Sequence, residues 1–516
     1  MKKLVGLSVF FATIMMSCTG TKDVNGTVID DTIKDDGLIT LQFIQVNDVY
    51  EIAPLGGGLY GGMERVAYVA DSVKALNKNS MLVMAGDFLN PSLLGTIKVD
   101  GERLKGKQMI DVMNAMDFDL VTFGNHEFDI GQEDLQKRLN ESTFPWTSAN
   151  VMEIDKGTKD FFEIEKMPAP KPIPETYTRT FTDKDGTTVN VGFFSVTVAS
   201  NPLDFVHYKE PVASSVQAYN YLKDKTDLIL GFTHLTLSED KQVADAIPEL
   251  KFIMGGHEHN AMLVPHNNAI IAKADANAKT AYIHTLTYNK NTDELSIDSH
   301  LRVIDDRTPS DPEVKAIVDT WTALLEEKIK EVIDNPYEVI YTSNPPLDGT
   351  DSANRSVQTD LGDMITSAML YSYRDDADAA IVNGGSIRID DMLPNNVASM
   401  DIFRTLPFGG SIVKVKITGA LLKEVLDYGK QSRGTGAYLQ YHNISENPTY
   451  GWNIGGNEID TEQVYTVAFS DFLLKGFDIP FLNRENVGVL EVYDPKENEL
   501  AYDIRKAIIN YLKTLK

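Results

Sequence analysis

Cysteine is almost absent from this sequence. Its 516 residues include a single cysteine, Cys18, so no disulfide can form within the chain. Positive charge is also scarce, because 48 lysines and arginines face 75 aspartates and glutamates, for a net charge of -27. No run of lysine and arginine supplies a basic patch, which argues against binding to a nucleic-acid polymer. A small phosphorylated substrate is not excluded, since a few metal ions and arginines can reverse the field locally.

The apolar run at the N-terminus is too short to span a membrane. It extends from Leu4 to Met16 after two lysines, which is typical of a secretory signal. Met15-Met16-Ser17-Cys18 resembles a bacterial lipobox, in which the cysteine is lipidated and becomes the mature N-terminus. We therefore expect residues 1–18 to be a lipoprotein signal peptide with a lipidated Cys18, and the polar residues 19–37 to be a flexible tether. This predicts an exported protein that is anchored by lipid to the bacterial cell envelope. Whether the anchor faces the periplasm or the cell surface stays open.

The length and the hydrophobic content of 42% indicate more than one core and about two large domains. Short apolar runs bounded by Gly, Asn or Asp predict buried strands, and segments with helical spacing lie between them. This alternation favours a layered α/β fold. The expected strands are 41–46, 81–85, 120–123, 228–232 and 252–254, and the expected helices include 62–76 and 107–116.

Metal-type ligands follow directly on each of these strands. Ligands in such folds bind beyond the carboxyl ends of the strands, so we expect one shared site there. A single histidine at a strand end is more often a structural residue, but the recurrence over five strands favours a metal site. The residues concerned are Asp48, Asp87, His234, His257 and His259, together with the stretch 124–129, which can supply a metal ligand, an imidazole and an orienting carboxylate.

A long amphipathic helix is predicted past the middle of the chain. Asp311 and Pro312 form a helix start, apolar residues recur at helical spacing, and Asp334-Asn335-Pro336 ends the pattern. The segment lies between the last metal-type ligand and a region without such a cluster. We interpret it as the connector between the two domains.

Ordered motifs along the whole chain resemble a known family. Those of the first half are similar to the calcineurin-like metallophosphatases, and those of the second half to the C-terminal domain of 5′-nucleotidases. The first set is Gln45-Val46-Asn47-Asp48, Ala85-Gly86-Asp87, Gly124-Asn125-His126-Glu127, Thr233-His234 and Gly256-His257-Glu258-His259. The second set is Asn383-Gly384-Gly385-Ser386-Ile387-Arg388, Leu406-Pro407-Phe408-Gly409-Gly410 and Phe472-Leu473-Leu474-Lys475-Gly476-Phe477-Asp478.

The resemblance implies an α/β (α+β) protein. We expect a calcineurin-like domain at 38–305, a four-layer β-sandwich flanked by helices. A linker helix would occupy 306–336, and a 5′-nucleotidase C-terminal α/β domain that binds the substrate would occupy 337–516.

The resemblance also implies two divalent metal ions. Asp87 would bridge them, Asn125, His234 and His257 would complete one site, and Asp48 and His259 would belong to the other. An asparagine ligand suits a hard cation better than zinc alone, so zinc, manganese and magnesium all stay open.

One residue departs from the family pattern. The motif after the first strand is usually Asp-x-His, whereas this chain has Asp48-Val49-Tyr50. A neutral phenol is a weak ligand, although an adjacent cation lowers its pKa. Our hypothesis is that Tyr50 either binds metal as a phenolate or leaves a water in its place.

By the same resemblance, His126 would be catalytic without binding metal. It would hydrogen-bond the phosphoryl oxygen or the leaving group, and Asp129 would fix its tautomer and stabilise its charged form. The expected reaction is in-line attack on phosphorus by a metal-bound hydroxide, without a covalent enzyme intermediate.

The second domain would bind the substrate. Arg355, Asn383 and Arg388 would contact phosphate or carboxylate-like oxygens, a task suited to guanidinium groups. Phe408 and Phe472 would sandwich the base, although either could be an ordinary core aromatic. Asp478 would accept hydrogen bonds from the ribose. The usual Gly-Gly-Asp-Gly run is Gly476-Phe477-Asp478-Ile479 here, which makes the base and sugar preference less certain.

The predicted function is a metal-dependent phosphoester hydrolase, above all a 5′-nucleotidase that releases phosphate from nucleoside monophosphates. Two alternatives remain at this point. One is hydrolysis of UDP-sugars or 2′,3′-cyclic nucleotides, and the other is a non-catalytic nucleotide-binding surface lipoprotein in which Tyr50 has disabled one metal site. The sequence leaves the oligomeric state open.

Overall fold

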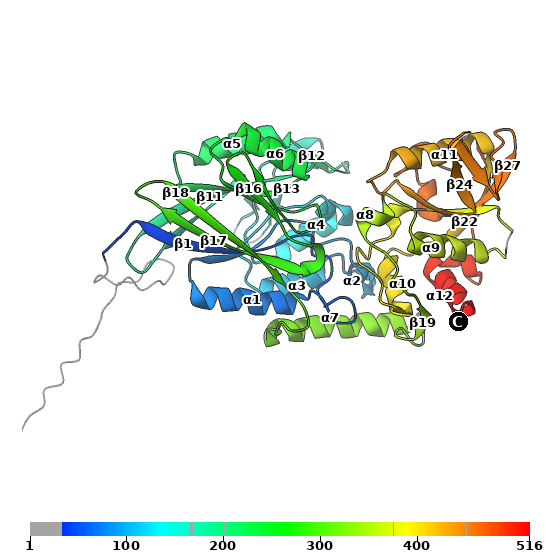
Figure 1. Cartoon of the computed structure of the whole chain (residues 1–516), viewed down its shortest axis with the longest axis horizontal. Helices are drawn as coiled ribbons and strands as arrows, with labels where there is room; N and C mark the ends of the chain where they lie inside the picture. The colour runs from blue at the N-terminus through cyan, green and yellow to red at the C-terminus, as the bar shows by residue number, and fades with distance from the viewer. Residues whose placement is uncertain (1–33, 166–168, 201–202, 375, 450) are drawn as a thin grey trace, which may run out of the picture.

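The computed structural model describes residues 34–165, 169–200, 203–374, 376–449 and 451–516. It has two lobes joined by a long helix (Figure 1). The expected signal segment and Cys18 lie outside the described residues. Within those residues, no helix is long and apolar enough to cross a membrane.

The first domain is a sandwich of two sheets. The first sheet has the order β18-β17-β1-β2-β5 and the second has the order β10-β11-β13-β14-β16-β15. The strands of the first sheet are β1 (Leu38–Val46), β2 (Ser80–Met84), β5 (Leu120–Val121), β17 (Thr280–Asn289) and β18 (Glu294–Val303). Those of the second are β10 (Thr176–Thr182), β11 (Thr188–Thr197), β13 (Leu228–His234), β14 (Phe252–Gly255), β15 (Met262–His266) and β16 (Ala269–Lys273).

Alternation along the strands creates three apolar layers. Leu41 and Phe43 of β1 face Phe193 and Phe232 of the other sheet, and together they form the centre of the sandwich. The outer face of the first sheet packs under α1 (Met63–Leu76) and α3 (Lys107–Ala115), and that of the second packs under α5 (Pro211–Leu222) and α6 (Leu237–Ala246). The order helix, sheet, sheet, helix confirms the predicted four-layer fold (Figure 1).

Helix α7 (Pro312–Lys330) connects the domains. The side chain of Asp311 accepts the backbone N–H groups of Glu313 and Val314, and Pro312 occupies the first turn. The helix is shorter than the expected linker helix of 306–336, and its face with Val314 and Val318 packs against α1 and α3. It therefore lies along the first domain and continues to the second.

The second domain contains a mixed five-stranded sheet of order β23-β20-β27-β22-β28. Helix α11 (Gly419–Gln431) packs on one face, while α9 (Asp360–Tyr371) and α12 (Ile504–Thr514) cover the other. The strands are β20 (Ala379–Asn383), β22 (Ile412–Thr418), β23 (Leu439–His442), β27 (Val464–Ser470) and β28 (Val489–Tyr493). The short elements α8 (Asp351–Asn354), α10 (Ser399–Thr405) and η4 (Asp471–Leu474) carry loops toward the first domain or the cavity described below.

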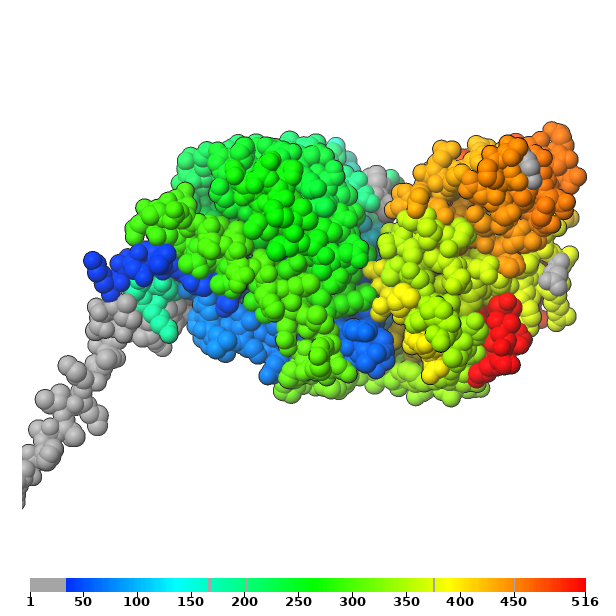
Figure 2. Space-filling model, in the orientation of Figure 1, coloured from blue at the N-terminus to red at the C-terminus, as the bar shows by residue number. Residues whose placement is uncertain are grey.

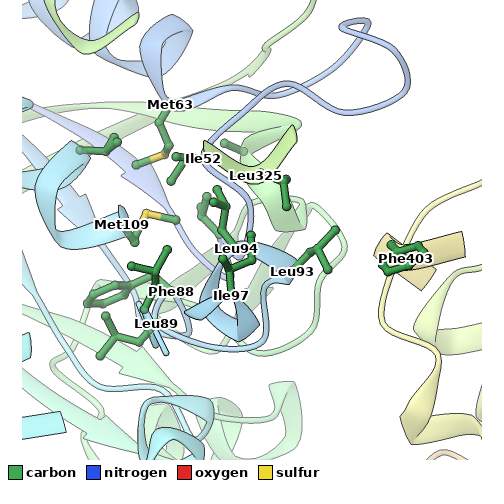
Figure 3. Packing of buried hydrophobic residues seen from close by; sticks show 14 of the residues in the cluster. Ile52, Met63, Phe88, Leu89, Leu93, Leu94, Ile97, Met109, Leu325 and Phe403 are labelled. Atoms are coloured by element: carbon green, nitrogen blue, oxygen red, sulfur yellow. The ribbon is translucent and has the colours of Figure 1, made fainter. Parts of the chain in front are cut away.

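The two lobes touch each other (Figure 2). One hydrophobic cluster contains buried residues of both, including Leu93 of α2 (Leu93–Thr96) and Phe403 of α10. Figure 3 shows Leu93 at the edge of this cluster, on the side that faces Phe403.

The first described residues pack on the first domain. The N–H of Asp36 donates to Asp185, and the hydroxyl of Thr187 donates to Asp35. The last residues of the expected tether therefore already pack on the first domain.

Candidate metal centre and substrate cavity

The predicted ligands all lie in loops that leave the carboxyl ends of strands. Asp48 follows β1, Asp87 follows β2, His234 ends β13, and His257 and His259 follow β14. A hydrogen bond between the two sheets brings these strand ends together. His234 Nδ1, at the end of β13, donates to the carbonyl of Ala85, which follows β2, at 2.7 Å. The loops turn sharply, with φ values of 53° for Asp48, 57° for Asp87, 84° for His257 and 59° for His259. Such conformations are rare for residues other than glycine and cluster at functional sites.

Two groups of three side chains have the spacing of metal sites. One is Asp87, His234 and His257, and the other is Asp48, Asp87 and His259, with the ligand atoms of each group within 4.8 Å of one another. Asp87 belongs to both groups, as a carboxylate that bridges two ions must. Asn125 joins the first group, since its Oδ1 lies 3.1 Å from His257 Nδ1. The structure thus brings together all six residues that the sequence suggested as ligands.

Unsatisfied polar atoms inside this centre fit a cation. Asp48 Oδ1 and His234 Nε2 are buried without a hydrogen-bond partner among the described residues. His234 Nε2 lies 3.1 Å from Asp87 Oδ2, and its Nδ1–H is already held by the Ala85 carbonyl. A nitrogen lone pair and a carboxylate facing each other repel unless a proton or a cation lies between them. The donor set of carboxylates, imidazoles and one amide suits two divalent ions.

The electrostatics of the centre lead to the same conclusion. Burial lowers the pKa of His234, but Asp87 and Asp48 outweigh burial and raise it to about 9. Burial raises the pKa of Asp87, yet the charges of His234 and His126 bring it well below its ordinary value. Burial, and then His234, lower the pKa of His257 to about 3. Asp87 is therefore charged and His257 neutral at neutral pH, and these are the forms that bind metal. The raised pKa of His234 means that a cation bound between His234 and Asp87 has to displace a proton.

Tyr50 lies inside the second group. Its hydroxyl is 2.9 Å from His259 Nε2 and donates to Asp87 Oδ2 at 3.3 Å. Burial, followed by the charges of Asp87 and Asp48, raises its pKa well above 10.0. The phenol is thus placed where the family motif has a histidine, within reach of the same ligands.

His126 and Asp129 form a pair beside the metal-type ligands. His126 Nδ1 lies 2.6 Å from Asp129 Oδ2, which leaves Nε2 as the nitrogen available to a substrate. The backbone N–H of His126 donates to Asp87 Oδ1 at 2.7 Å. This bond holds the backbone of His126 next to the Asp87 carboxylate.

Glu127 is a site residue to which the sequence analysis assigned no role. Its buried carboxylate accepts the backbone N–H groups of Asp87 at 2.9 Å, Phe88 at 2.7 Å and Leu89 at 3.1 Å, and also that of Gly124. It thus ties the loop after β2 to the loop after β5. In the sequence, this role was indicated by the position of Glu127 in the motif Gly124-Asn125-His126-Glu127.

A cavity of about 900 Å³ joins the metal centre to the second domain. Its first-domain lining includes Asp87, Asn125, His126, His257 and His259. Its second-domain lining includes Arg355, Asn383, Arg388, Phe472 and Asp478, which are five of the six residues predicted to bind substrate. The sixth, Phe408, does not line the cavity. Its side chain is 51% exposed, and its ring centroid lies 6.0 Å from the Arg388 guanidinium carbon.

Two arginines that line this cavity have N–H groups without a hydrogen-bond partner among the described residues. The Nε atoms of Arg355 and Arg388 are buried without a hydrogen-bond partner in the described part of the chain. Arg355 pairs with Asp351 at 2.5 Å. The amide of Asn383 donates to Asp478 Oδ2 at 2.7 Å. Partly buried guanidinium groups that line a cavity match an oxyanion such as phosphate.

An aromatic pair of the second domain also lines the cavity. The ring centroids of Phe472 and Phe477 are 6.0 Å apart with an interplanar angle of 47°. Phe477 is 74% exposed and lines the cavity together with Phe472. The departure from the Gly-Gly-Asp-Gly run therefore adds an aromatic side chain to the lining.

Comparison with known proteins identifies the family. Residues 41–261 match the calcineurin-like phosphoesterases, and residues 339–483 match the 5′-nucleotidase C-terminal domain. The chain belongs to the metallophosphatases that carry a 5′-nucleotidase C-terminal domain. It is accordingly a metal-dependent phosphoric-ester hydrolase with a dinuclear divalent metal centre, which confirms the predicted class of enzyme and cofactor.

The individual relatives have low sequence identity to this chain but align over most of its length. The trifunctional nucleotide phosphoesterase YfkN of Bacillus subtilis is 26% identical over 512 residues, which cover 87% of this chain and 33% of YfkN, so the chain spans about a third of that protein. The 5′-nucleotidase of Bos taurus is 24% identical over 81% of this chain and 78% of its own length. The 5′-nucleotidase of Vibrio cholerae is 25% identical over 77% of each.

Solved structures confirm the fold over both domains. The 5′-nucleotidase precursor of Thermus thermophilus superimposes with a TM-score of 0.72 at 21% identity, covering 93% of this chain and 97% of that one. The 5′-nucleotidase of Candida albicans gives a TM-score of 0.60 at 13% identity, over 93% and 98% of the two chains. The two-domain arrangement predicted from the motifs is thus confirmed as a fold.

Proposed function

We propose that the protein is a 5′-nucleotidase that releases phosphate from nucleoside monophosphates held between its two domains. The observation that carries this proposal is the continuous cavity. Its lining combines the metal-type ligands of the first domain with two arginines, an aromatic pair and Asp478 of the second domain. These groups match the phosphate, the base and the ribose of a nucleoside monophosphate.

Each side chain would have a defined task. Arg355 and Arg388 would hold the phosphoryl oxygens through bonds between charged groups, which are stronger than neutral ones. Phe472 would stack on the base, and Asp478 would accept hydrogen bonds from the ribose hydroxyls. The amide of Asn383 holds one oxygen of this carboxylate in place.

His126 would act on the reacting group. Its Nδ1–H is held by Asp129, so Nε2 faces the substrate and can hydrogen-bond an oxygen on which negative charge develops. The two divalent cations, when bound by Asp48, Asp87, Asn125, His234, His257 and His259, would activate water and neutralise phosphate charge. Tyr50, within hydrogen-bond distance of His259, would complete or weaken one of the two sites.

We also propose that the protein is exported and attached to the cell envelope through Cys18. The N-terminal motif supports this, and the venom 5′-nucleotidase of Naja atra, 25% identical over 82% of this chain, is by its name a secreted relative. Metabolic labelling with a radioactive or alkyne-tagged fatty acid tests the anchor. Label should enter the wild type and not Cys18→Ala, and equal labelling of both would contradict it.

Phosphate release by a chain lacking residues 1–18 tests the activity. The substrates are AMP, UMP, a UDP-sugar, a 2′,3′-cyclic nucleotide and an aryl phosphate, each with manganese, zinc or magnesium. The proposal expects the highest kcat/KM with a nucleoside monophosphate. A higher value with the UDP-sugar or the cyclic nucleotide would transfer the assignment to that substrate, and no release with any of them would favour a binding protein.

A further inference from the structure

One metal-type ligand of the first domain is held by the second. His259 Nδ1 lies 2.9 Å from Asp390 Oδ2, although the two residues are 131 positions apart and belong to different domains. The other nitrogen of the ring, Nε2, faces Asp48 Oδ1 at 3.3 Å and the Tyr50 hydroxyl at 2.9 Å. The Asp390 carboxylate therefore determines which nitrogen of His259 faces the metal centre.

The other two ligand imidazoles have partners from their own domain. His234 Nδ1 is held by the carbonyl of Ala85, and His257 Nδ1 contacts Asn125, itself a candidate ligand of the first domain. Histidines that bind metal almost always donate their second N–H to an acceptor that fixes the ring, and loss of this acceptor typically weakens metal binding by about 10- to 100-fold. For His259 this acceptor comes from the substrate-binding domain.

Asp390 is itself fixed in place. Its Oδ1 accepts the backbone N–H of Asp351 at 2.9 Å, and its carbonyl oxygen accepts a hydrogen bond from Lys279 of the first domain at 3.0 Å. Its φ of 43° is a conformation that aspartate and asparagine adopt more readily than most residues. Asp351 in turn pairs with Arg355, so Asp390 is linked through Asp351 to an arginine of the cavity.

We propose that Asp390 is a positioning residue for His259, and that one of the two metal sites is completed only when the domains meet. The sequence motifs give Asp390 no role, and it lies two residues after Arg388. The inference rests on the two-metal centre of the proposed function. It predicts that the site of Asp48, Asp87 and His259 depends on the second domain, whereas the site of Asp87, Asn125, His234 and His257 does not.

The test is metal binding by the full chain, without substrate. The protein is stripped with a chelator, dialysed against a series of free Mn²⁺ concentrations, and its ions per chain are measured by mass spectrometry of the metal. Asp390→Asn keeps a residue suited to the backbone conformation and removes the charge. It should bind one ion as the wild type does, and the other about 10- to 100-fold more weakly.

A neighbouring carboxylate gives the matched control. Asp391 lies in the same loop and pairs with Lys279 at 3.4 Å, and among the described residues no contact joins it to His259. Asp391→Asn should bind both ions as the wild type does. Loss of the same ion in both variants would mean that the loop acts only as an interface, and would overturn the proposal.

A double-mutant cycle with His259→Ala completes the test. Because Asp390 acts through His259, the double variant should bind metal no more weakly than His259→Ala alone, whereas independent effects would add. Asp390→Asn with two ions at wild-type affinity would overturn the inference and leave the proposed function standing. A wild type that binds fewer than two ions would instead count against the two-metal centre itself.

Discussion

Glu127 accepts the backbone N–H of Asp87 at 2.9 Å and so fixes the loop that carries the carboxylate shared by both candidate metal groups. The side chain is fully buried and has further N–H donors on both oxygens. In Glu127→Gln an amide NH₂ replaces one acceptor and faces these donors. We expect the free energy of unfolding to fall by about 1–3 kcal/mol, and the metal content to fall with it.

Chemical denaturation and metal analysis check this prediction. Glu133→Gln is the control, because this glutamate is close in sequence but its side chain is 86% exposed. It should behave as the wild type. Equal stability and metal content in the two variants would mean that the bonds of Glu127 contribute little.

Tyr50→Phe separates the role of the hydroxyl group from that of the aromatic ring. The variant keeps the packing but loses the contacts of the hydroxyl with His259 and Asp87. If Tyr50 contributes to the metal site, the affinity for one ion, the choice between zinc and manganese, or turnover will change. Metal content, metal affinity and turnover that all match the wild type would rule out a coordinating role.

The aromatic end of the cavity should contribute to nucleotide selectivity. Phe472→Ala should lower kcat/KM for AMP by about 10- to 100-fold, because stacking of a base on an aromatic ring contributes about 1–3 kcal/mol. A small aryl phosphate, which leaves this end empty, should be hydrolysed almost as before. Equal losses for both substrates would point to a damaged fold instead.

Phe408→Ala is the informative comparison for this variant. Phe408 lies outside the cavity lining in this arrangement of the domains, so its removal should affect AMP hydrolysis less than the loss of Phe472. A loss as large as that of Phe472→Ala would mean that Phe408 reaches the base, as the family pattern implies.

His284 makes stability depend on pH. It is buried between Gln45 and Ser299, and burial lowers its pKa to about 3 from 6.5. Between pH 3 and pH 6.5, His284 therefore binds a proton in the unfolded chain but not in the folded chain. This contribution to stability is present above pH 6.5 and is lost as the pH falls toward 3. At pH 5 the loss should be about 2 kcal/mol.

Denaturation of the metal-free protein at pH 7 and pH 5 measures this effect. His284→Gln cannot take up the proton, so its stability should change less between the two pH values than that of the wild type. The same change in both proteins would assign the pH dependence to other groups.

The ligand set was accessible from sequence because it depends on local patterns. Strand runs followed at once by Asp48, Asp87, His234 or His257 predict residues at one edge of a layered fold, and the structure brings them together. The helix connecting the domains was also recognised, since the Asp311-Pro312 start is a local signal. Its end was misjudged, because helical spacing continues beyond Lys330 into residues that are no longer helical.

Contacts between the domains could not be predicted in this way. Asp390 meets His259 across 131 residues, and nothing in its own neighbourhood indicates a partner in the other domain. The position of Phe408 outside the cavity also depends on how the domains meet. Glu127 was within a recognised motif, but its bonds to backbone N–H groups leave no pattern in the residues that donate them.

The decisive measurement is phosphate release from AMP by the wild type and by His126→Ala, with the ions bound per chain determined on the same samples. His126 lies beside Asp87 but is not among the six ligands, so the variant should keep both ions. Its turnover should fall by about 10²- to 10⁴-fold, as expected for loss of a group that transfers or stabilises a proton. Two bound ions together with undiminished turnover would contradict the proposed role of His126, and an inactive wild type with both ions bound would contradict the proposed nucleotidase activity.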